Sequence, residues 1–406
     1  MKRAVTSLFS ILPDMETTLR ARLSLEEGAA HLTQLLRSMG RSTPSPLRDR
    51  ALSWMEAGDL SHLFTEQVLK EDWKYTPMDL LRQRWDYVPF EYGQPFGVAG
   101  DSLSDPRESL DERNPAIQSF PEPLSPWEAL LAGAAHQRHF MLADGEPIGV
   151  ALRNPGAFAA QLFTAIVPES AVGEVWFSLE GEGLSLVRWH LHVQRGGRLR
   201  FYYPSPRDSG ESYRYLILTA YVEEDATIET YELHAATAWM RSEMRIQLGG
   251  QRASAHLHGA TQVTEGAFAD TAIRVEHRAP HTESNQLFKS LVEAGGRRAF
   301  QGRIFVSRAA QKTNAYQSHK ALLTAPSAVS YSRPQLEIFA DDVRCTHGVT
   351  TGFLQGDMLF YLQARGIPEE KARSMLHRAF LAEVVEKVPH AALRTWAEEY
   401  FTLPKV

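Results

Sequence analysis

Between about residues 140 and 352, apolar and polar residues alternate with a period of two, and this pattern restricts the folds open to the chain. The segment MRIQL, residues 244–248, places three apolar side chains on one face of a strand and two polar side chains on the other. Pairs of adjacent glycines interrupt the alternation at residues 196–197, 249–250 and 295–296. The pattern predicts a long all-β region of many short strands. Because no strict sequence repeat is visible, a sandwich, a barrel and a solenoid all stay open.

The segments on either side of this region show the spacing of helices. Residues 1–138 contain amphipathic stretches and a proline-rich loop at about residues 100–126. After residue 353 the helical period returns, and Pro368 suits the first turn of a helix. We therefore expect an N-terminal helical region over residues 1–138, a β core over 139–352 and a C-terminal helical domain over 353–406.

The C-terminal domain carries an apolar stripe along one helix. Glu369 and Glu370 suit the positive end of that helix's dipole. The members of the stripe follow at helical spacing: Ala372, Met375, Leu376, Ala379, Phe380, Val384 and Val388. Because the stripe comes directly after a β domain, it covers either the open end of that domain or the groove of a partner.

Composition narrows the classes of partner and the compartment. The net charge is −6 over 406 residues and the basic residues are scattered, so we expect no nucleic-acid partner. No apolar run of about 18 residues occurs, so we expect no membrane span. The first residues lack a signal-peptide cleavage site. A single cysteine excludes a disulfide framework within one chain and suits a reducing cytoplasm, where we expect the protein to be located.

Two pairs of histidines are candidates for a metal site. His190 and His192 share one face of a strand in RWHLHV, and His256 and His258 do the same in SAHLHG. Imidazoles at this spacing occur in metal-binding barrels, which would make the chain a metal-dependent, cupin-like enzyme. The simpler interpretation is a polar outer face without a ligand.

The third candidate is the only cysteine, Cys345, which lies two residues before His347 in DDVRCTHG. On a strand the two side chains share a face, and a thiolate and an imidazole can ligate one soft or borderline metal. Two ligands are too few, so the others come from elsewhere in the chain or from a second chain. The alternative is that Cys345 is a small buried core residue, as cysteines often are.

This stretch belongs to a C-terminal third that resembles the SufB/SufD family of iron-sulfur cluster assembly proteins. The resemblance covers roughly residues 277–388, with a further family-like segment, KEDWKYT, at residues 70–76. Its segments, in order, are HTESNQLFKS, FQGRIFVSRAAQKTNAYQSHKALL, RPQLEIFADDVRCTHGVTTG and LFYLQARGIP. SufB-like chains usually carry further cysteines, so the single cysteine favours the SufD branch.

The resemblance implies a right-handed parallel β-helix with flanking helices. It also implies a non-catalytic scaffold subunit of a complex with SufB and with SufC, the ATPase. In this family the C-terminal helical region docks SufC, which here corresponds to Ala372, Met375, Leu376, Ala379 and Phe380. A family cysteine and histidine, here Cys345 and His347, face SufB where the cluster forms.

The site residues so implied hold the nascent iron-sulfur cluster only transiently, and no tightly bound cofactor is expected. The missing ligands of the Cys345 and His347 pair are then those of SufB. When SufB is absent, a β-helix end with exposed strand edges can instead pair with a second copy of the chain, giving a homodimer.

Overall fold

The computed structural model describes residues 97–98, 136–142, 144, 147–205, 212–236 and 238–401. All of them belong to one compact unit of the chain. The helical region and proline-rich loop expected within residues 1–138 lie outside the described residues, apart from 97–98 and 136–138, which belong to strands.

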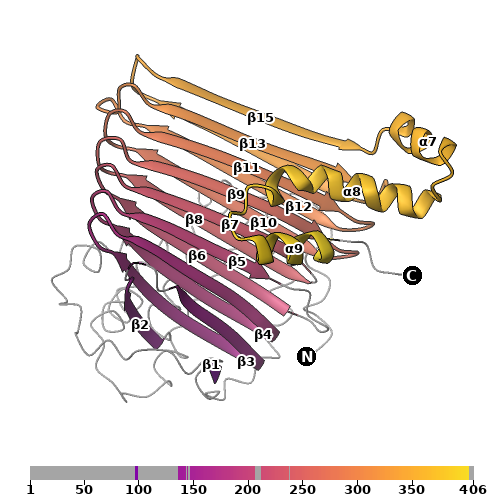
Figure 1. Cartoon of the computed structure of the whole chain (residues 1–406), viewed down its shortest axis with the longest axis horizontal. Coiled ribbons are helices and arrows are strands. Elements are labelled where there is room, and N and C mark those ends of the chain that lie inside the picture. Colours follow the sequence, from indigo (N-terminus) through magenta and orange to yellow (C-terminus); the bar gives the residue numbers. More distant parts are fainter. Residues whose placement is uncertain are drawn as a thin grey trace, which may run out of the picture. The chain divides into compact units, whose positions relative to one another are not determined.

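The described chain is dominated by parallel β-strands (Figure 1). The first eight are β1 (Gly97–Val98), β2 (His136–Met141), β3 (Ile148–Val167), β4 (Val172–Val193), β5 (Arg198–Ser205), β6 (Ser212–Val222), β7 (Thr227–Ala236) and β8 (Trp239–Leu248). The remainder are β9 (Ser254–Val263), β10 (Phe268–His277), β11 (Glu283–Val292), β12 (Arg297–Val306), β13 (Asn314–Leu323), β14 (Val329–Ile338) and β15 (Arg344–Phe353). Except for β1, which is antiparallel to β3, each of these strands pairs in parallel.

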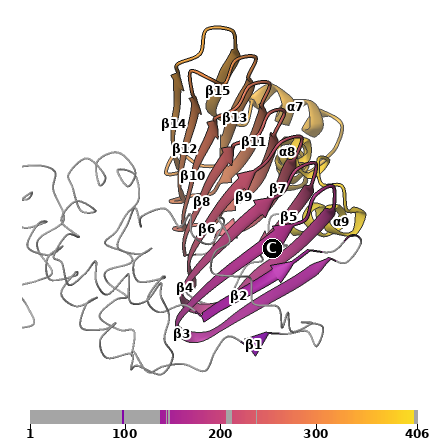
Figure 2. The same ribbon diagram turned by 90° about the vertical axis from the view of Figure 1, so that its left-hand side faces the viewer.

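The pairing order is that of a solenoid in which consecutive strands alternate between two sheets. The first residues of β4 pair with β5 and its later residues pair with β6. From there one sheet runs β6, β8, β10, β12, β14 and the other runs β5, β7, β9, β11, β13, β15. Figure 2 shows the two sheets side by side. The parallel β-helix implied by the resemblance is therefore confirmed, and a closed barrel is wrong because β14 and β15 end the sheet without pairing with each other.

One corner of the solenoid is built from residues in the left-handed region of backbone space. Each of these turns has one such residue, and its backbone N–H donates to a carbonyl oxygen of the next turn at 2.7–3.2 Å. The six residues, with φ of 56–66°, are Ser170, Gly196, Asp225, Arg252, His281 and Lys312. Gly196 is the only glycine among them, and it is the residue type that adopts this conformation without steric cost. The glycine pairs that interrupt the alternation lie between strands.

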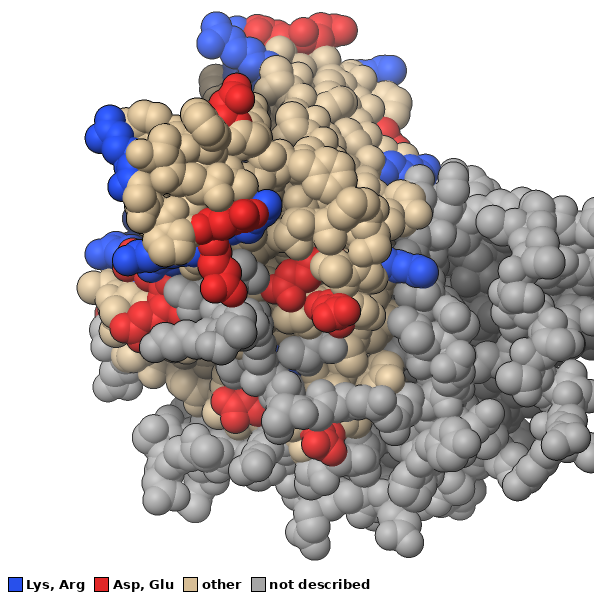
Figure 3. Space-filling view, turned by 90° about the vertical axis from the view of Figure 1, so that its right-hand side faces the viewer, with Lys and Arg blue, Asp and Glu red and all other residues tan. Residues whose placement is uncertain are grey.

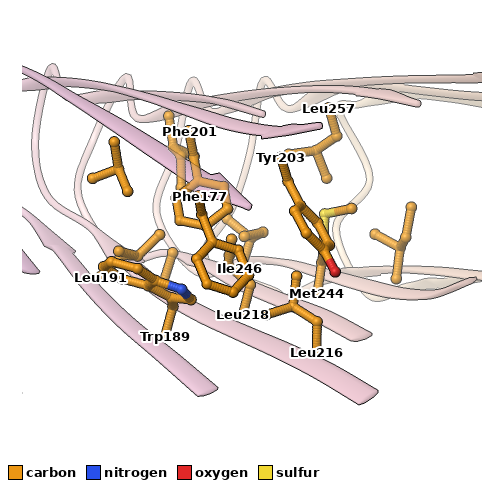
Figure 4. Packing of buried hydrophobic residues seen from close by; sticks show 14 of the residues in the cluster. Phe177, Trp189, Leu191, Phe201, Tyr203, Leu216, Leu218, Met244, Ile246 and Leu257 are labelled. Carbon is orange, nitrogen blue, oxygen red and sulfur yellow. The ribbon is translucent and has the colours of Figure 1, made fainter. Parts of the chain in front are cut away.

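The core fills the space between the two sheets, where side chains from opposite strands interdigitate (Figure 4). Phe177 and Tyr203 project from one side, and Trp189, Leu218 and Met244 from the other. All five are at most 2% exposed, which identifies the core-forming face of each strand. The predicted apolar face of residues 244–248 is confirmed, because its three members are buried in this core.

Three helices follow in the described residues: α7 (Gly356–Ala364), α8 (Glu369–Val385) and α9 (Ala391–Tyr400). Helices α8 and α9 lie over the outer face of the β5–β15 sheet (Figure 1). There Leu381, Val384 and Leu393 join one apolar cluster with Leu233 and Leu291 of the strands. Helix α7 has no buried residue. None of the described helices is long and apolar enough to cross a membrane.

Candidate functional site

Cys345 and His347 lie on β15, the last strand of the solenoid. In register they sit beside Ala315 and Gln317 of β13. The other edge of β15 pairs with no described strand, and β14 is likewise paired only with β12. The two candidate ligands therefore lie at the open end of the β-helix, as residues of a strand with a free edge.

Cys345 is half-buried in the last turn. It packs beside the apolar cluster that includes Ala315 and Ala340, together with Leu336 and Val343. Burial raises the pKa of the Cys345 thiol, because the charged thiolate is less well solvated there. The thiol is therefore neutral near pH 7, and it becomes a good ligand only when a metal displaces its proton.

His347 is exposed at the open end of the β-helix. Its side chain lies on the same face of β15 as Cys345, whose packing shows that this face points to the interior. No hydrogen bond or ion pair involves the imidazole in the described part of the chain. Within the described residues no group of three histidine, cysteine or carboxylate side chains is placed to hold a metal ion. The pair is thus half of a metal site at most.

Apolar side chains are exposed around the same end of the molecule. They are Tyr316, Tyr331, Ile338, Phe339 and Phe353 of the last two turns, and Met358, Phe360 and Tyr361 of α7. Phe360, at 71%, is the most exposed of them. Figure 3 views the side from which α7 projects in Figure 1, and uncharged side chains form much of the described surface in its upper half. Exposed apolar groups gathered in this way mark interaction surfaces.

The structure divides the apolar stripe of α8 between its own domain and solvent. Ala372 is buried, and Phe380 packs against the cluster that joins α8 to the strands. Met375 and Leu376 are partly buried and Ala379 is exposed. The stripe therefore covers the flank of the chain's own β-helix, and all of the five residues predicted to dock a partner except Ala372 keep some exposure.

Sequence reasoning missed the contact that holds α8 in place. Lys289 of β11 donates from Nζ to the Phe380 carbonyl at 2.7 Å and lies 2.6 Å from a Glu383 carboxylate oxygen. Lys320 of β13 lies 3.5 Å from the same carboxylate. These contacts lower the pKa of Glu383, the Lys289 hydrogen bond being the largest cause. The signal available was a lysine in the apolar run QLFKSLV, which no local pattern assigns to a partner.

The four paired histidines do not form a metal site. His190 and His192 project from the outer face of β4, in the part of that strand that leads to β6, while His256 and His258 belong to β9 of the other sheet. His192 Nε2 lies 2.7 Å from a Glu223 carboxylate oxygen. The cupin-like enzyme is therefore wrong in its fold, and the two pairs lie on different sheets and cannot share one ion.

His258 shows what one member of these pairs does instead. Its ring stacks on Tyr231 with centroids 5.2 Å apart. Burial and the neighbouring His256 lower the pKa of His258 to about 4, so it is neutral near pH 7. It serves packing on the outer face of the sheet.

The sequence is similar to a known family and to individual proteins. Residues 163–380 match the family described as SUF system FeS cluster assembly, SufBD core domain. The iron-sulfur cluster assembly protein SufD of Escherichia coli is 34% identical over 171 residues, which are 42% of this chain and 40% of that protein. The chloroplast protein ABCI7 of Arabidopsis thaliana is 43% identical over 122 residues, 30% of this chain and 26% of the relative.

A SufBD family protein of Synechocystis sp. is 29% identical over 188 residues, 46% of this chain and 42% of its own length. Each of these matches thus spans less than half of the relative. The family match itself runs from β3 to α8, takes in Cys345 and His347 and covers more than half of the chain. The chain therefore belongs to the SufBD core domain family of the SUF iron-sulfur cluster assembly system.

Proposed function

We propose that the chain is a SufD-like scaffold subunit, without ATPase activity of its own, on which an iron-sulfur cluster is assembled together with a SufB-like chain. The observation that carries this proposal is the half-site on β15. An exposed imidazole beside a single half-buried thiol, on a strand with a free edge, needs ligands from a second chain. The cluster is cargo here and not a resident cofactor. The proposed location is the cytoplasm, where reducing conditions keep Cys345 a free thiol.

The SufB-like partner is proposed to bind at β14 and β15. Free strand edges offer a row of unpaired N–H and C=O groups to another strand. The exposed aromatic residues Tyr316, Tyr331 and Phe353 lie near these edges. Pairing with the partner would bury their apolar surface. Partner ligands would then arrive next to His347.

The SufC-like ATPase is proposed to dock on the C-terminal helices. The best-exposed apolar side chains there are Met358, Phe360 and Tyr361 of α7, a helix that contacts α8. Met375, Leu376 and Ala379 of α8 extend this surface, whereas Ala372 and Phe380 support α8 from within. Movement of the bound ATPase would reach the β-helix through α8.

The test is coexpression of the full chain with the SufB-like and SufC-like chains of the same source, followed by measurement of iron and sulfide in the purified complex. His347→Ala is expected to leave complex formation intact, because the side chain is exposed, and to lower cluster content by about tenfold or more, since a lost ligand costs at least as much as a lost supporting contact.

His281→Asn is the matched control. His281 is exposed at a corner of the solenoid with φ of 58°, a conformation that asparagine tolerates. This variant is expected to keep wild-type cluster content. Wild-type content in the His347→Ala complex would exclude the β15 half-site as the place of assembly.

A further inference from the structure

Two glutamine side chains form a column directly beneath His347, inside the β-helix. Gln317 of β13 pairs in register with His347 of β15, and Gln286 of β11 pairs with Gln317. Both glutamines are 0% exposed. In-register residues of neighbouring parallel strands project to the same side at a spacing of about 4.8 Å. The column therefore runs from the interior of the β-helix to its open end, where His347 lies.

Neither amide has a hydrogen-bond partner in the described part of the chain. Both Nε2 and Oε1 are unpaired in Gln317 and in Gln286. Burying an amide without a partner is unfavourable, and native interiors contain few such groups. An apolar side chain of the same size would avoid this cost, so the amides need another explanation.

A glycine of the opposite sheet makes room for the Gln317 amide. Gly302 of β12 faces Gln317, and a Cβ at this glycine would overlap the Gln317 amide. The residue above Gly302 in the last turn is Pro334 of β14. The amide of Gln317 thus lies across the interior, one turn below His347, in a place that only a glycine leaves free.

We infer that Gln317 is the positioning residue of His347: the two side chains are not bonded in the structure, and rotation of the exposed imidazole over the Gln317 amide forms a hydrogen bond at one ring nitrogen and directs the other toward the cargo iron. This inference rests on the proposed function. Imidazoles that ligate metals are usually held by a hydrogen bond at the second nitrogen, which selects the tautomer and the ring orientation. His347 and Gln317 lack hydrogen-bond partners in the described residues, each other included, and occupy paired positions, so rotation of the imidazole would give one amide atom and one ring nitrogen a partner.

Gln286 provides a matched control within the same column. It has the same side chain, the same burial and the same unpaired atoms as Gln317. Because it lies one turn deeper, Gln317 separates it from His347. A purely structural role for buried amides would make the two positions equivalent, whereas positioning of His347 belongs to Gln317 alone.

The first experiment observes the His347 ring by nitrogen NMR in the full chain labelled at histidine, with His347→Ala for assignment. The wild type is expected to show a single tautomer. Gln317→Leu is expected to show a mixture, and Gln286→Leu to match the wild type. Gln317→Glu, which keeps an acceptor oxygen at the same reach, is expected to restore the single tautomer. An unchanged His347 signal in Gln317→Leu would overturn the inference.

The second experiment measures iron and sulfide in the three-chain complex. Gln317→Leu is expected to lower cluster content about 10-fold to 100-fold, the range for loss of such supporting contacts, and Gln286→Leu is expected to leave it unchanged. Equal losses in both variants would make the amides structural and overturn the inference. If Gln317→Leu does not fold, Gly302→Ala displaces the amide without removing it and is expected to give the same mixed tautomer; a single tautomer there also counts against the inference.

The two proposals fail in different ways. Loss of cluster in His347→Ala with normal content in Gln317→Leu would leave the proposed function standing and reject the positioning role. Normal content in both variants would reject the assembly site on β15 and the positioning role with it.

Discussion

At the scale of single residues, the β-helix buries histidines in the neutral form. His277 is 0% exposed, with Nδ1 2.8 Å from the Thr282 hydroxyl and Nε2 2.9 Å from the Ser284 hydroxyl. Burial lowers its pKa to about 4. Two serine or threonine hydroxyls can serve a neutral ring, whereas an imidazolium there would be a buried charge without a carboxylate. Acid therefore destabilises the folded solenoid by protonating its buried imidazoles as well as its carboxylates.

The pKa of His277 leads to a prediction about pH. Between pH 6.5 and about 4 the unfolded chain binds a proton that folded His277 does not, so the free energy of unfolding falls as the pH falls through this window. The contribution of His277 is about 3 kcal/mol over the full window. Chemical denaturation at several pH values should show a shallower pH dependence for His277→Gln than for the wild type. The exposed control, His281→Asn, should keep the wild-type slope; equal slopes for all three chains would contradict a neutral His277.

At the scale of elements, α8 is attached to the β-helix by a buried cation as well as by its apolar face. The side chain of Lys289 is 7% exposed, while that of its partner Glu383 is 47% exposed. The ammonium also lies 4.7 Å from the centroid of the Phe380 ring. Because the lysine is the buried member of the pair, the two partners are not equivalent.

This asymmetry predicts which substitution loosens α8. Glu383→Gln leaves a buried ammonium without its counter-charge and is expected to cost about 1–3 kcal/mol of unfolding free energy. Lys289→Met replaces the cation with an apolar side chain of similar length and is expected to cost less. Hydrogen exchange of the α8 amides is the measurement, with Glu386→Gln, an exposed residue of the same region, as control. A larger effect from Lys289→Met would show that packing and not charge holds the helix.

Helix α7 supports a prediction about docking. Phe360→Glu is expected to abolish copurification of the SufC-like chain without unfolding the protein, because no α7 residue is buried. Gln355→Glu places the same charge at an exposed position beside the start of this helix and is expected to keep copurification normal. Retained capture by Phe360→Glu would move the docking surface away from α7.

The sequence predicted the elements better than their neighbours. Alternation along 244–248 is a local property, so the strand and its buried face follow from it directly. The stripe on α8 indicates that one face is covered but carries no information on what covers it, and the flank of the β-helix became visible only in the structure. In the same way Cys345 and His347 could be proposed as a pair because they lie two residues apart in the chain, whereas Gln317 is placed beside His347 only by the stacking of turns.

At the scale of the whole molecule, the last turn ends both sheets, and β14 and β15 each have one edge that pairs with no described strand. One edge carries Pro334 in β14, which has no N–H to donate and so discourages pairing there. The edge of β15 has no proline. Pairing with a second chain is therefore favoured at β15, next to the half-site.

Strand pairing at β15 can be tested through its outward N–H groups. The Arg344 N–H donates to the Thr313 carbonyl of the previous turn, so the N–H groups of odd-numbered residues, Thr351 included, point to the free edge. Thr351→Pro is expected to prevent both pairing with the SufB-like chain and homodimer formation, while circular dichroism keeps the wild-type β signal. Thr351→Ala is the control. Sedimentation measures the assembly state, and a normal heterodimer with Thr351→Pro would place the interface elsewhere.

The corner ladder, in which one left-handed residue per turn donates its N–H to the next turn, makes the solenoid a stack of units that depend mainly on their immediate neighbours. In such a one-dimensional stack an inner unit is supported from both sides and a terminal unit from one, so opening begins at the end. Cys345 and His347 belong to the terminal unit. A second chain seated on β15 would turn that unit into an inner one, so assembly of the two chains and ordering of the two candidate ligands would become a single cooperative event.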